Sequence, residues 1–330
     1  MRRAVTRRLA MTGAATSVVL GIQAARAAGS SLPSTPSLLV AGPAGSPADQ
    51  WAQVIAGPLG AALQGQAGAS LAAENVGGGD GVTGVNQYQA RTAPDGATAL
   101  LMPGAALMAW LVGDTRVRFD AGSWAPLWGA TTGSIVVTRG PLIAGRAVRV
   151  AVPDLGEPGL EAVLALELMG LVPIPVTGSG RDEVDAVYLH GAAAHETLAG
   201  TGFTPAFSLT GRPGRDPAFP NLPQAAELFT PASSANSVAI AQFQGVSAAA
   251  SIDVALVLPA VAPATVLAWW RHGCAQMDDA PAVRAAAVAG NVRQDDAGQI
   301  ATQLSCVALD MPAMLSLRQR LADRYHWRPR

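Results

Sequence analysis

At 330 residues with a hydrophobic fraction of 50%, the chain is long and apolar enough for two domains with full cores, which excludes a largely disordered protein. All 22 basic residues are Arg and five of them precede residue 28, so the remainder carries 17 Arg against 23 acidic residues, a net charge of −6. This balance argues against nucleic acid and anionic membranes as partners, since both are bound by clustered cations.

The N-terminus has the pattern of a secretory signal. Basic residues stand at positions 2, 3, 7 and 8, a weakly apolar run follows from Leu9 to Ile22, and Ala25-Arg26-Ala27 forms an A-x-A cleavage site. We therefore expect a signal peptide over residues 1–27 and a periplasmic mature chain. The pair Arg7-Arg8 leaves twin-arginine export and the general route both open. No later apolar run approaches the roughly 20 uninterrupted residues of a membrane-spanning helix.

The first elements alternate between strand and helix. We expect a short buried strand at Leu38–Val40 and, after a glycine- and proline-rich loop, a helix at Pro47–Leu63. The stretch that follows contains an apolar run at Ser70–Ala73, a glycine cluster, a helical run at Val82–Ala93, and a second apolar run at Ala97–Met102. A strand, a crossover helix and a strand predict parallel pairing, because parallel strands need a long connection.

The same alternation continues through the second half of the chain. Strands are expected at Trp124–Thr132, Ser134–Thr138, Arg149–Pro153, Val172–Val176, Val184–Leu189 and Phe203–Leu209, with a helix at Leu160–Met169. Pro231–Ser237 and Ala255–Pro259 are interpreted as return strands, Ala264–Ala275 and Ala280–Gly290 as helices, and an apolar pattern resumes over Ile300–Leu321. The fold class is therefore α/β, with two domains that each contain a mainly parallel sheet flanked by helices.

A formal dinucleotide fingerprint occurs in the glycine cluster. Gly79, Gly81 and Gly84 match G-x-G-x-x-G at a strand-to-helix junction. The fingerprint also needs an acidic residue about 20 positions later, at the end of the next strand. Asp95 comes too early and lies in a turn, and an exported protein rarely meets free dinucleotide. We interpret the glycines as a structural turn and expect no cofactor.

Catalytic motifs are not found in the sequence. There is no G-x-S-x-G and no H-E-x-x-H, and the four His are scattered. His190 and His195, with Glu196 beside the second, are the one candidate for a metal site, and lone histidines near a strand end are more often ordinary surface or core residues. We expect neither an enzyme nor a metal protein, with a secreted hydrolase of unrecognised type as a weaker alternative.

Cys274 and Cys306 are the two cysteines of the chain. An oxidising compartment permits a disulfide between them, and two cysteines cannot form a zinc site alone. A Cys274–Cys306 bridge and two free thiols both stay open, because sequence does not give the distance between their Cα atoms.

Three segments together resemble a known family. They are V-x-x-P-x-G-x-x-x-D from Val40 to Asp49, the run E-N-x-x-G-G-x-G-x-x-G with the following A-P-D-G-x-T-x-L-L-M between Glu74 and Met102, and F-P-N-L-P-Q-A-A-E-L from Phe219 to Leu228. The chain resembles the substrate-binding proteins of tripartite tricarboxylate transporters, periplasmic receptors also called Bug proteins, as a divergent member.

The resemblance implies a two-domain periplasmic binding protein of type II. Domain one would comprise residues 28–133, domain two residues 134–245, and residues 246–330 would return to domain one and add the C-terminal helices. The family captures small organic ligands in the cleft between the domains and passes them to a tripartite-type membrane transporter or a sensor kinase. The expected state is a monomer.

The resemblance also places ligand-binding residues. In open α/β sheets ligands bind beyond the carboxyl ends of the strands, so the loops there should face one another. By position, the ligand-binding residues would be Pro43, Gly45, Ser46 and Asp49 in the first loop, Pro103, Gly104 and Ala105 in the next, Leu155, Gly156 and Glu157 in domain two, Thr177 and Gly178 further on, and His190 at a strand end.

The sequence departs from the family in domain two. Where the family has N-G-T-S at a helix start, residues 155–158 read L-G-E-P, and Glu157 would repel a ligand carboxylate. The usual Asp of the later strand end becomes Leu189 or His190, and the link after Val176 is too short for an ordinary helix. We expect a ligand altered from simple dicarboxylates toward a neutral, aromatic or cationic molecule. The alternative is a decayed cleft in a ligand-independent partner of an extracytoplasmic sensor.

Overall fold

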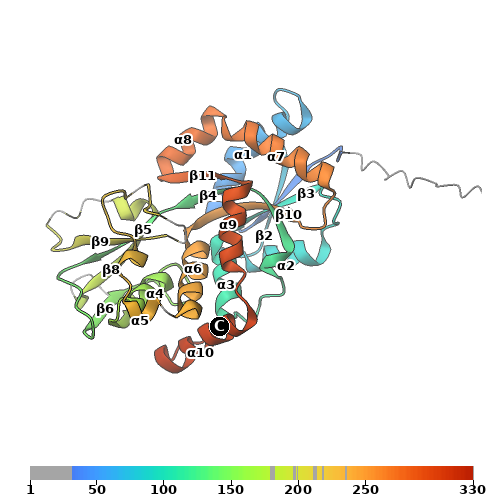
Figure 1. Cartoon of the computed structure of the whole chain (residues 1–330). Coiled ribbons are helices and arrows are strands. Elements are labelled where there is room, and N and C mark those ends of the chain that lie inside the picture. Colours follow the sequence, from blue (N-terminus) through green and yellow to red (C-terminus); the bar gives the residue numbers. More distant parts are fainter. Residues whose placement is uncertain are drawn as a thin grey trace, which may run out of the picture. The chain divides into compact units, whose positions relative to one another are not determined.

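A computed structural model (Figure 1) describes residues 32–178, 183–195, 198, 200–210, 214–217, 219–234 and 236–329. By their contacts, Leu32–Arg330 form one compact unit. The expected signal peptide, residues 1–27, lies outside the described residues. Two sheets, each packed against helices, form the framework of this unit.

The first sheet has six strands in the order β11-β4-β10-β3-β1-β2. Its strands are β1 (Ser37–Ala41), β2 (Ala72–Val76), β3 (Thr98–Pro103), β4 (Trp124–Thr132), β10 (Ile252–Pro259) and β11 (Val292–Asp296). β1 pairs in parallel with both β2 and β3, whereas β10 runs antiparallel to β3 and β4, and β11 antiparallel to β4. The predicted parallel strand–helix–strand unit is therefore present, with β1 between its two strands.

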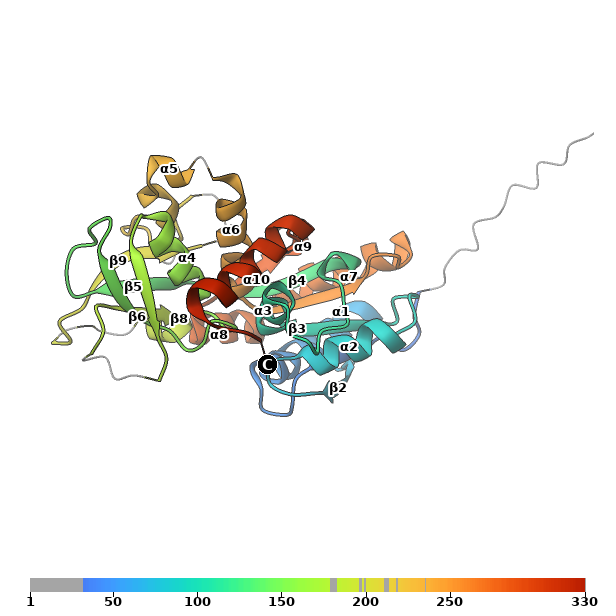
Figure 2. The same cartoon turned by 90° about the horizontal axis from the view of Figure 1, so that it is seen from below.

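Both faces of this sheet are covered, because alternate side chains of a strand point to opposite faces. Leu38 and Val40 of β1 belong to the core cluster shared with α1 (Pro47–Gln64), α7 (Ala264–Asp278) and α8 (Pro281–Gly290). Leu39 and Ala41 belong to the cluster shared with α2 (Val82–Arg91), α3 (Gly104–Val112) and α9 (Ala297–Val307). Figure 2 shows the elements from below.

The second sheet has five strands in the order β7-β6-β8-β5-β9. They are β5 (Ser134–Thr138), β6 (Ala147–Ala151), β7 (Val172–Val176), β8 (Ala186–His190) and β9 (Thr204–Leu209), with α4 (Leu160–Leu168) between β6 and β7 in the chain. β6 pairs in parallel with β7 and β8, and β5 runs antiparallel to β8 and β9. Short helical turns occupy Ala121–Ser123, Gly191–His195 and Ala225–Leu228.

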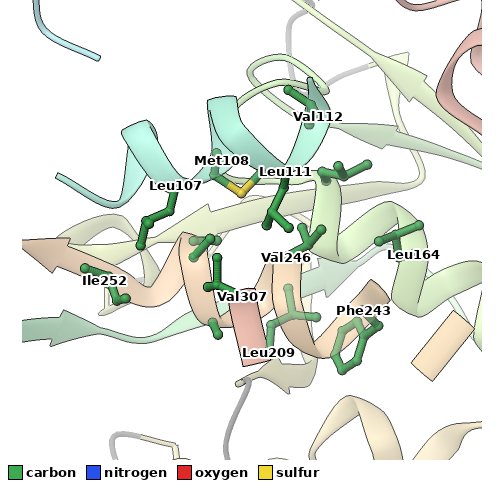
Figure 3. Packing of buried hydrophobic residues seen from close by; sticks show 14 of the residues in the cluster. Leu107, Met108, Leu111, Val112, Leu164, Leu209, Phe243, Val246, Ile252 and Val307 are labelled. Atoms are coloured by element: carbon green, nitrogen blue, oxygen red, sulfur yellow. The ribbon is translucent and has the colours of Figure 1, made fainter. Parts of the chain in front are cut away.

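One apolar core runs from the first sheet to the second. The chain crosses at Gly133, between β4 and β5, and returns through α6 (Ser237–Ser251), which leads directly into β10. Figure 3 shows α3 side chains such as Leu107 and Leu111 in one cluster with Val246 of α6, Leu164 of α4 and Leu209 of β9. The shared cluster explains why the contacts define one compact unit although the strands form two sheets.

Several elements differ from the sequence-based expectation. Pro231–Ser237, expected as a strand, contains no strand among its described residues. Helix α5 spans Pro231–Ser234, and α6 begins at Ser237 after Asn236, whose side chain caps it by accepting from the Ala239 N–H at 3.1 Å. Most of α6, together with α3 and β11, was not predicted. Strand β2 extends to Val76 and lies at an edge of the sheet with most of its residues exposed.

The C-terminal apolar pattern at Ile300–Leu321 forms two helices, α9 and α10 (Met311–Tyr325), rather than one. Asp310 starts the second by accepting a hydrogen bond from the Ala313 N–H at 2.8 Å, with a proline in the first turn. Among the described residues no single helix is long and apolar enough to cross a membrane, and α9 with α10 meets that test only as a pair bent by 65°.

The two cysteines are free thiols, so the alternative of a Cys274–Cys306 disulfide is wrong. Cys274 is buried in α7 within the cluster on one face of the six-stranded sheet. Cys306 is half-buried in α9 and packs against the cluster on the other face. Because the two side chains belong to clusters on opposite faces of the sheet, no bridge forms.

Candidate functional site

The loop after β1 is held in place by the carboxylate of Asp49. Its Oδ2 accepts hydrogen bonds from the Gly45 N–H (2.7 Å) and from Gln53 Nε2 (2.8 Å), and its Oδ1 accepts one from Asn75 Nδ2 (2.9 Å). The bond from the Gly45 amide, and after it the bond from Asn75, lowers the pKa of Asp49. Asp49 thus orders the loop from inside and leaves Pro43 and Gly45 exposed.

Helix α1 begins at this loop. Ser46 is its N-cap and accepts from the Asp49 N–H at 3.3 Å, and Pro47 occupies the first turn. One turn further, the nearly buried Trp51 donates a hydrogen bond from Nε1 to Oδ2 of Asp253 at 2.6 Å. The start of α1 is thereby tied to the start of β10, which carries Asp253.

The end of β3 is packed rather than open. A Cβ on Gly104, the first residue of α3, would lie 2.2 Å from the carbonyl oxygen of Ile252 and 2.3 Å from that of Ala249. Pro103 is also buried, and a Cβ on Gly81 would lie 2.7 Å from its ring. Both Pro103 and Gly104 therefore pack against protein atoms, and Ala105 is the first residue after β3 that lines a cleft.

That cleft measures about 890 Å³ and lies among the β2–α2 loop, α3 and the β6–α4 loop. We call it the tail cleft, because Trp327–Pro329 from the C-terminus line it. The β2–α2 loop contributes Gly79 and Asp80, and the β6–α4 loop contributes Gly156 and Glu157 among others. Its volume is in the range of sites for small organic molecules.

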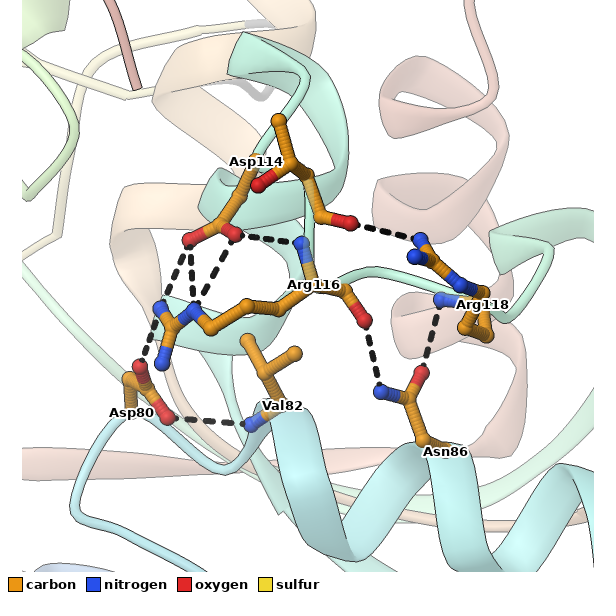
Figure 4. Close-up of polar contacts among 7 residues, drawn as sticks. Asp80, Val82, Asn86, Asp114, Arg116 and Arg118 are labelled. Atoms are coloured by element: carbon orange, nitrogen blue, oxygen red, sulfur yellow. Dashed lines mark hydrogen bonds and ion pairs between the residues drawn. The ribbon is translucent and has the colours of Figure 1, made fainter. Parts of the chain in front are cut away.

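One arginine neutralises much of the acidic charge in the tail cleft (Figure 4). Arg116 Nη2 lies 2.7 Å from Asp80 Oδ2 and 2.6 Å from Asp114 Oδ2, and the bonds from Arg116 lower the pKa of Asp114. Asn86 holds the same segment by donating to the Arg116 carbonyl at 2.8 Å and accepting from the Arg118 N–H at 2.7 Å. This network fixes the α3–β4 loop to the start of α2.

The C-terminal tail covers the β6–α4 loop. Trp327 Nε1 donates to Asp154 Oδ1 at 3.0 Å, and a Cβ on Gly156 would lie 2.8 Å from the Trp327 ring. Helix α10 delivers this residue and is itself tied to α4, because Glu167 accepts from Arg320 (3.2 Å), pairs with Arg324 (2.8 Å) and accepts from the Tyr325 hydroxyl. A ligand at Gly156 would have to share this surface with an indole ring of the chain itself.

A buried carboxylate lies behind the same loop. Glu161, in the first turn of α4, is fully buried, and its Oε2 accepts from the Gly159 N–H at 2.8 Å while its Oε1 has no partner among the described residues. Burial raises the pKa of Glu161 to about 7. Burial also raises the pKa of Tyr188, which lies close enough to Glu161 for their charges to interact.

A second cavity, of about 610 Å³, lies where the chain crosses between the sheets, and we call it the crossover cavity. Pro47, Gln50 and Trp51 of α1 line one part. Thr132 at the end of β4, His190 and Gly191 at the end of β8, and Asp253 at the start of β10 line another. His190 Nε2 lies 3.0 Å from the Ala250 carbonyl oxygen, and burial lowers the pKa of the ring. The cavity therefore contains residues from the ends of both sheets, as expected for a binding site in an open α/β protein.

Comparison with known proteins identifies the fold. No family model and no curated protein matches the sequence. Among solved structures, a TctC solute binding protein from Polaromonas without ligand matches 87% of this chain and 99% of its own, with 16% identity and a TM-score of 0.62. The periplasmic binding protein BugD matches 90% of this chain and 100% of its own at 18% identity and TM-score 0.50, and an R. palustris protein with adipate matches 86% and 97% at 15% identity and TM-score 0.51.

The chain has the TctC and Bug binding-protein fold. The matches cover nearly the full length of both partners, so the predicted fold class is confirmed, and these matched proteins are described as binding proteins or by a bound ligand rather than as enzymes. In this binding-protein fold the change of sheet falls at Gly133, next to the expected boundary after residue 133. The domain limits themselves stay predictions.

The predicted site residues are distributed over several places in this fold. Ala105, Gly156 and Glu157 line the tail cleft, and His190 lines the crossover cavity. Those that line neither are Pro43, Gly45, Ser46, Asp49, Pro103, Gly104, Leu155, Thr177 and Gly178. Leu155 is buried in the core, whereas Thr177 and Gly178 are exposed. Their contacts with a ligand stay predictions.

The metal alternative finds no geometric support in the described part of the chain. His190 is stacked on Tyr188 and His195 on Phe219, with ring centroids 6.1 Å and 4.7 Å apart. Glu196 lies outside the described residues. Within the described residues no three His, Cys, Asp or Glu side chains gather as a metal site would require.

Sequence reasoning missed three residues that line the tail cleft or the crossover cavity. Trp51 and Asp253 meet across 202 positions of the chain, which no local spacing indicates. Trp327 comes from the C-terminal tail and has no motif around it. The one available signal was the position of Trp51, a helical turn after the predicted Pro47 start of α1, because residues of that first turn flank the first loop.

Proposed function

We propose that the chain is an extracytoplasmic solute-binding protein that captures a small organic ligand between the ends of its two sheets. The observation that carries the proposal is the crossover cavity, in which α1 after β1, the end of β8 and the start of β10 meet around about 610 Å³. Ligands of open α/β sheets bind beyond the carboxyl ends of the strands, where this cavity lies. The fold shared with the Polaromonas and BugD proteins supports the same function.

The family resemblance adds the expected location and partner. The protein acts in the periplasm as a monomer and hands its ligand to a tripartite tricarboxylate-type transporter or to a sensor kinase. The matched R. palustris structure contains adipate, so dicarboxylates are the first ligand class to examine. The acidic residues of both clefts here, Glu157 in one and Asp253 in the other, support a ligand different from a plain dicarboxylate.

A thermal-shift screen of the mature chain, from Ala28 onward, tests the proposal. The panel contains dicarboxylates, amino acids, aromatic acids and amines. Each compound is added at two concentrations, so that a saturable rise in Tm can be recognised. A ligand that binds only the folded state stabilises it by about 2.7 kcal/mol at a hundredfold excess over Kd. We expect a saturable rise in Tm with at least one class and no turnover of that compound. Silence across the panel would contradict a receptor function.

A further inference from the structure

Among the described residues, the lining of the crossover cavity contains an acidic side chain and no arginine. Of the described residues that line it, Asp253 carries the one carboxylate, and none is an arginine; the whole chain has no lysine. His190 is the other ionisable residue of the lining, and burial lowers its pKa, which favours the neutral ring. A ligand carboxylate here would face a negative charge with no cation to compensate for its lost hydration.

Asp253 is fixed in position through a line of aromatic contacts. Its Oδ2 accepts from Trp51 Nε1 at 2.6 Å, and Trp51 packs edge-on against Trp128 with ring centroids 5.5 Å apart. Trp128 in turn donates from Nε1 to Asp278 Oδ1 at 2.8 Å. Asp253 itself is half-buried, and its Oδ1 has no hydrogen-bond partner among the described residues. One oxygen is therefore occupied, and the other is available to a donor in the cavity.

A second polar group without a partner lies beside the same space. The hydroxyl of Thr132 is buried and has no hydrogen-bond partner among the described residues, and it lies 3.5 Å from the position of a Cβ on Gly191. Thr132 and Gly191 both line the cavity. Gln50 adds an amide, and several of the other lining residues are apolar, among them Val54, Ala286 and Ala289. Because a hydroxyl can both donate and accept, Thr132 suits either kind of head group, and the carboxylate of Asp253 is the group that favours a hydrogen-bond-donating head on a ligand with an apolar remainder.

We propose that the crossover cavity binds a small organic amine in its cationic form, with the ammonium group on the free oxygen of Asp253 and the apolar part against Val54, Ala286 and Ala289. This inference rests on the proposed receptor function and names its ligand class. An ammonium group offers donors and no acceptor, and it forms its strongest hydrogen bonds with a carboxylate. Burial raises the pKa of Asp253, because it disfavours the charged carboxylate. A bound cation favours the charged form and so offsets the free-energy cost of burying it.

Isothermal titration with three molecules of one shape tests the inference. Benzylamine, benzyl alcohol and benzoate share the ring and differ in the head group, and putrescine, malate and adipate extend the amine and dicarboxylate classes. We expect an amine to bind the mature protein and its affinity to fall by roughly 30-fold or more in Asp253→Asn, since one partner of a desolvated charge pair is lost. Asp323→Asn, which removes an exposed carboxylate of α10, is the matched control and should leave the affinity unchanged.

The variant is chosen so that folding does not obscure the result. Asparagine keeps an oxygen that accepts from Trp51, so the urea unfolding midpoint of Asp253→Asn should stay close to that of the wild type. Tight binding of malate or adipate that Asp253→Asn leaves unchanged would overturn the amine assignment while the receptor function stands. Silence with every compound, here and in the thermal-shift panel, would overturn both.

Discussion

The buried carboxylate of Glu161 makes a quantitative prediction about stability and pH. In the folded protein it is fully buried, with one oxygen bonded to the Gly159 N–H and the other unpartnered among the described residues. Burial raises its pKa from 4.5 to about 7. Replacing Glu161 with Gln keeps an oxygen for the Gly159 amide and removes the ionisable group.

The magnitude follows from the two pKa values of Glu161. Between pH 4.5 and 7 the folded protein keeps a proton that the unfolded chain releases, so the free energy of unfolding decreases as the pH rises through this window. Above pH 7 the whole contribution, about 3 kcal/mol relative to acidic solution, is lost. At pH 8 the Glu161→Gln variant should therefore be more stable than the wild type by a similar amount, and at pH 4 the two should nearly coincide.

Urea unfolding at pH 4, 6 and 8, followed by tryptophan fluorescence, measures this difference. Glu157→Gln, which removes an exposed carboxylate of the preceding loop, serves as the matched control. Comparing variant with wild type at each pH removes the contribution of the other titrating groups. A wild type and a Glu161→Gln variant with the same pH dependence would refute the account of Glu161.

Two further predictions concern packing. Gly104→Ala should destabilise the protein by about 3 kcal/mol or more, because its Cβ would lie 2.2 Å from the carbonyl oxygen of Ile252. A urea unfolding midpoint equal to that of the wild type would contradict this. Glu167→Gln should lower the free energy of unfolding by about 1–3 kcal/mol, because the Glu167 side chain, 8% exposed, loses the charge that Arg320 pairs with. A variant with the same Tm as the wild type, in both low and high salt, would contradict this.

The elements that could be predicted are those whose own residues, or the turns beside them, mark where they begin and end. In β1 the buried residues Leu38 to Ala41 form a continuous apolar run, as expected for a strand covered on both faces, and the glycine cluster and Pro94-Asp95-Gly96 turn marked the limits of α2. Helix α6 was missed because it packs against α3, α4, α9 and α10 at once, so its apolar residues form no single stripe. Strand β11 was missed because its sequence V-R-Q-D-D is mostly polar at a sheet edge.

The candidate site was predicted only in part, because some of its residues are neighbours in the chain and others are brought together only by the fold. The first loop could be located because its glycines, proline and Asp49 lie within ten residues. The pair Trp51 and Asp253 depends on β10 returning beside β3 and β4, an antiparallel insertion that nothing near either residue specifies. The packing of Trp327 on Gly156 likewise depends on where α10 ends.

The most direct test of the central claim, that a ligand is held between the ends of both sheets, is titration of the best compound from the screen against one variant from each side. Gln50→Ala alters the α1 side of the crossover cavity, and His190→Ala alters the end of β8. A ligand held by both sides should lose several-fold in affinity with each variant, about the value of one hydrogen bond or contact. Affinity that falls with one variant and stays unchanged with the other would contradict the claim.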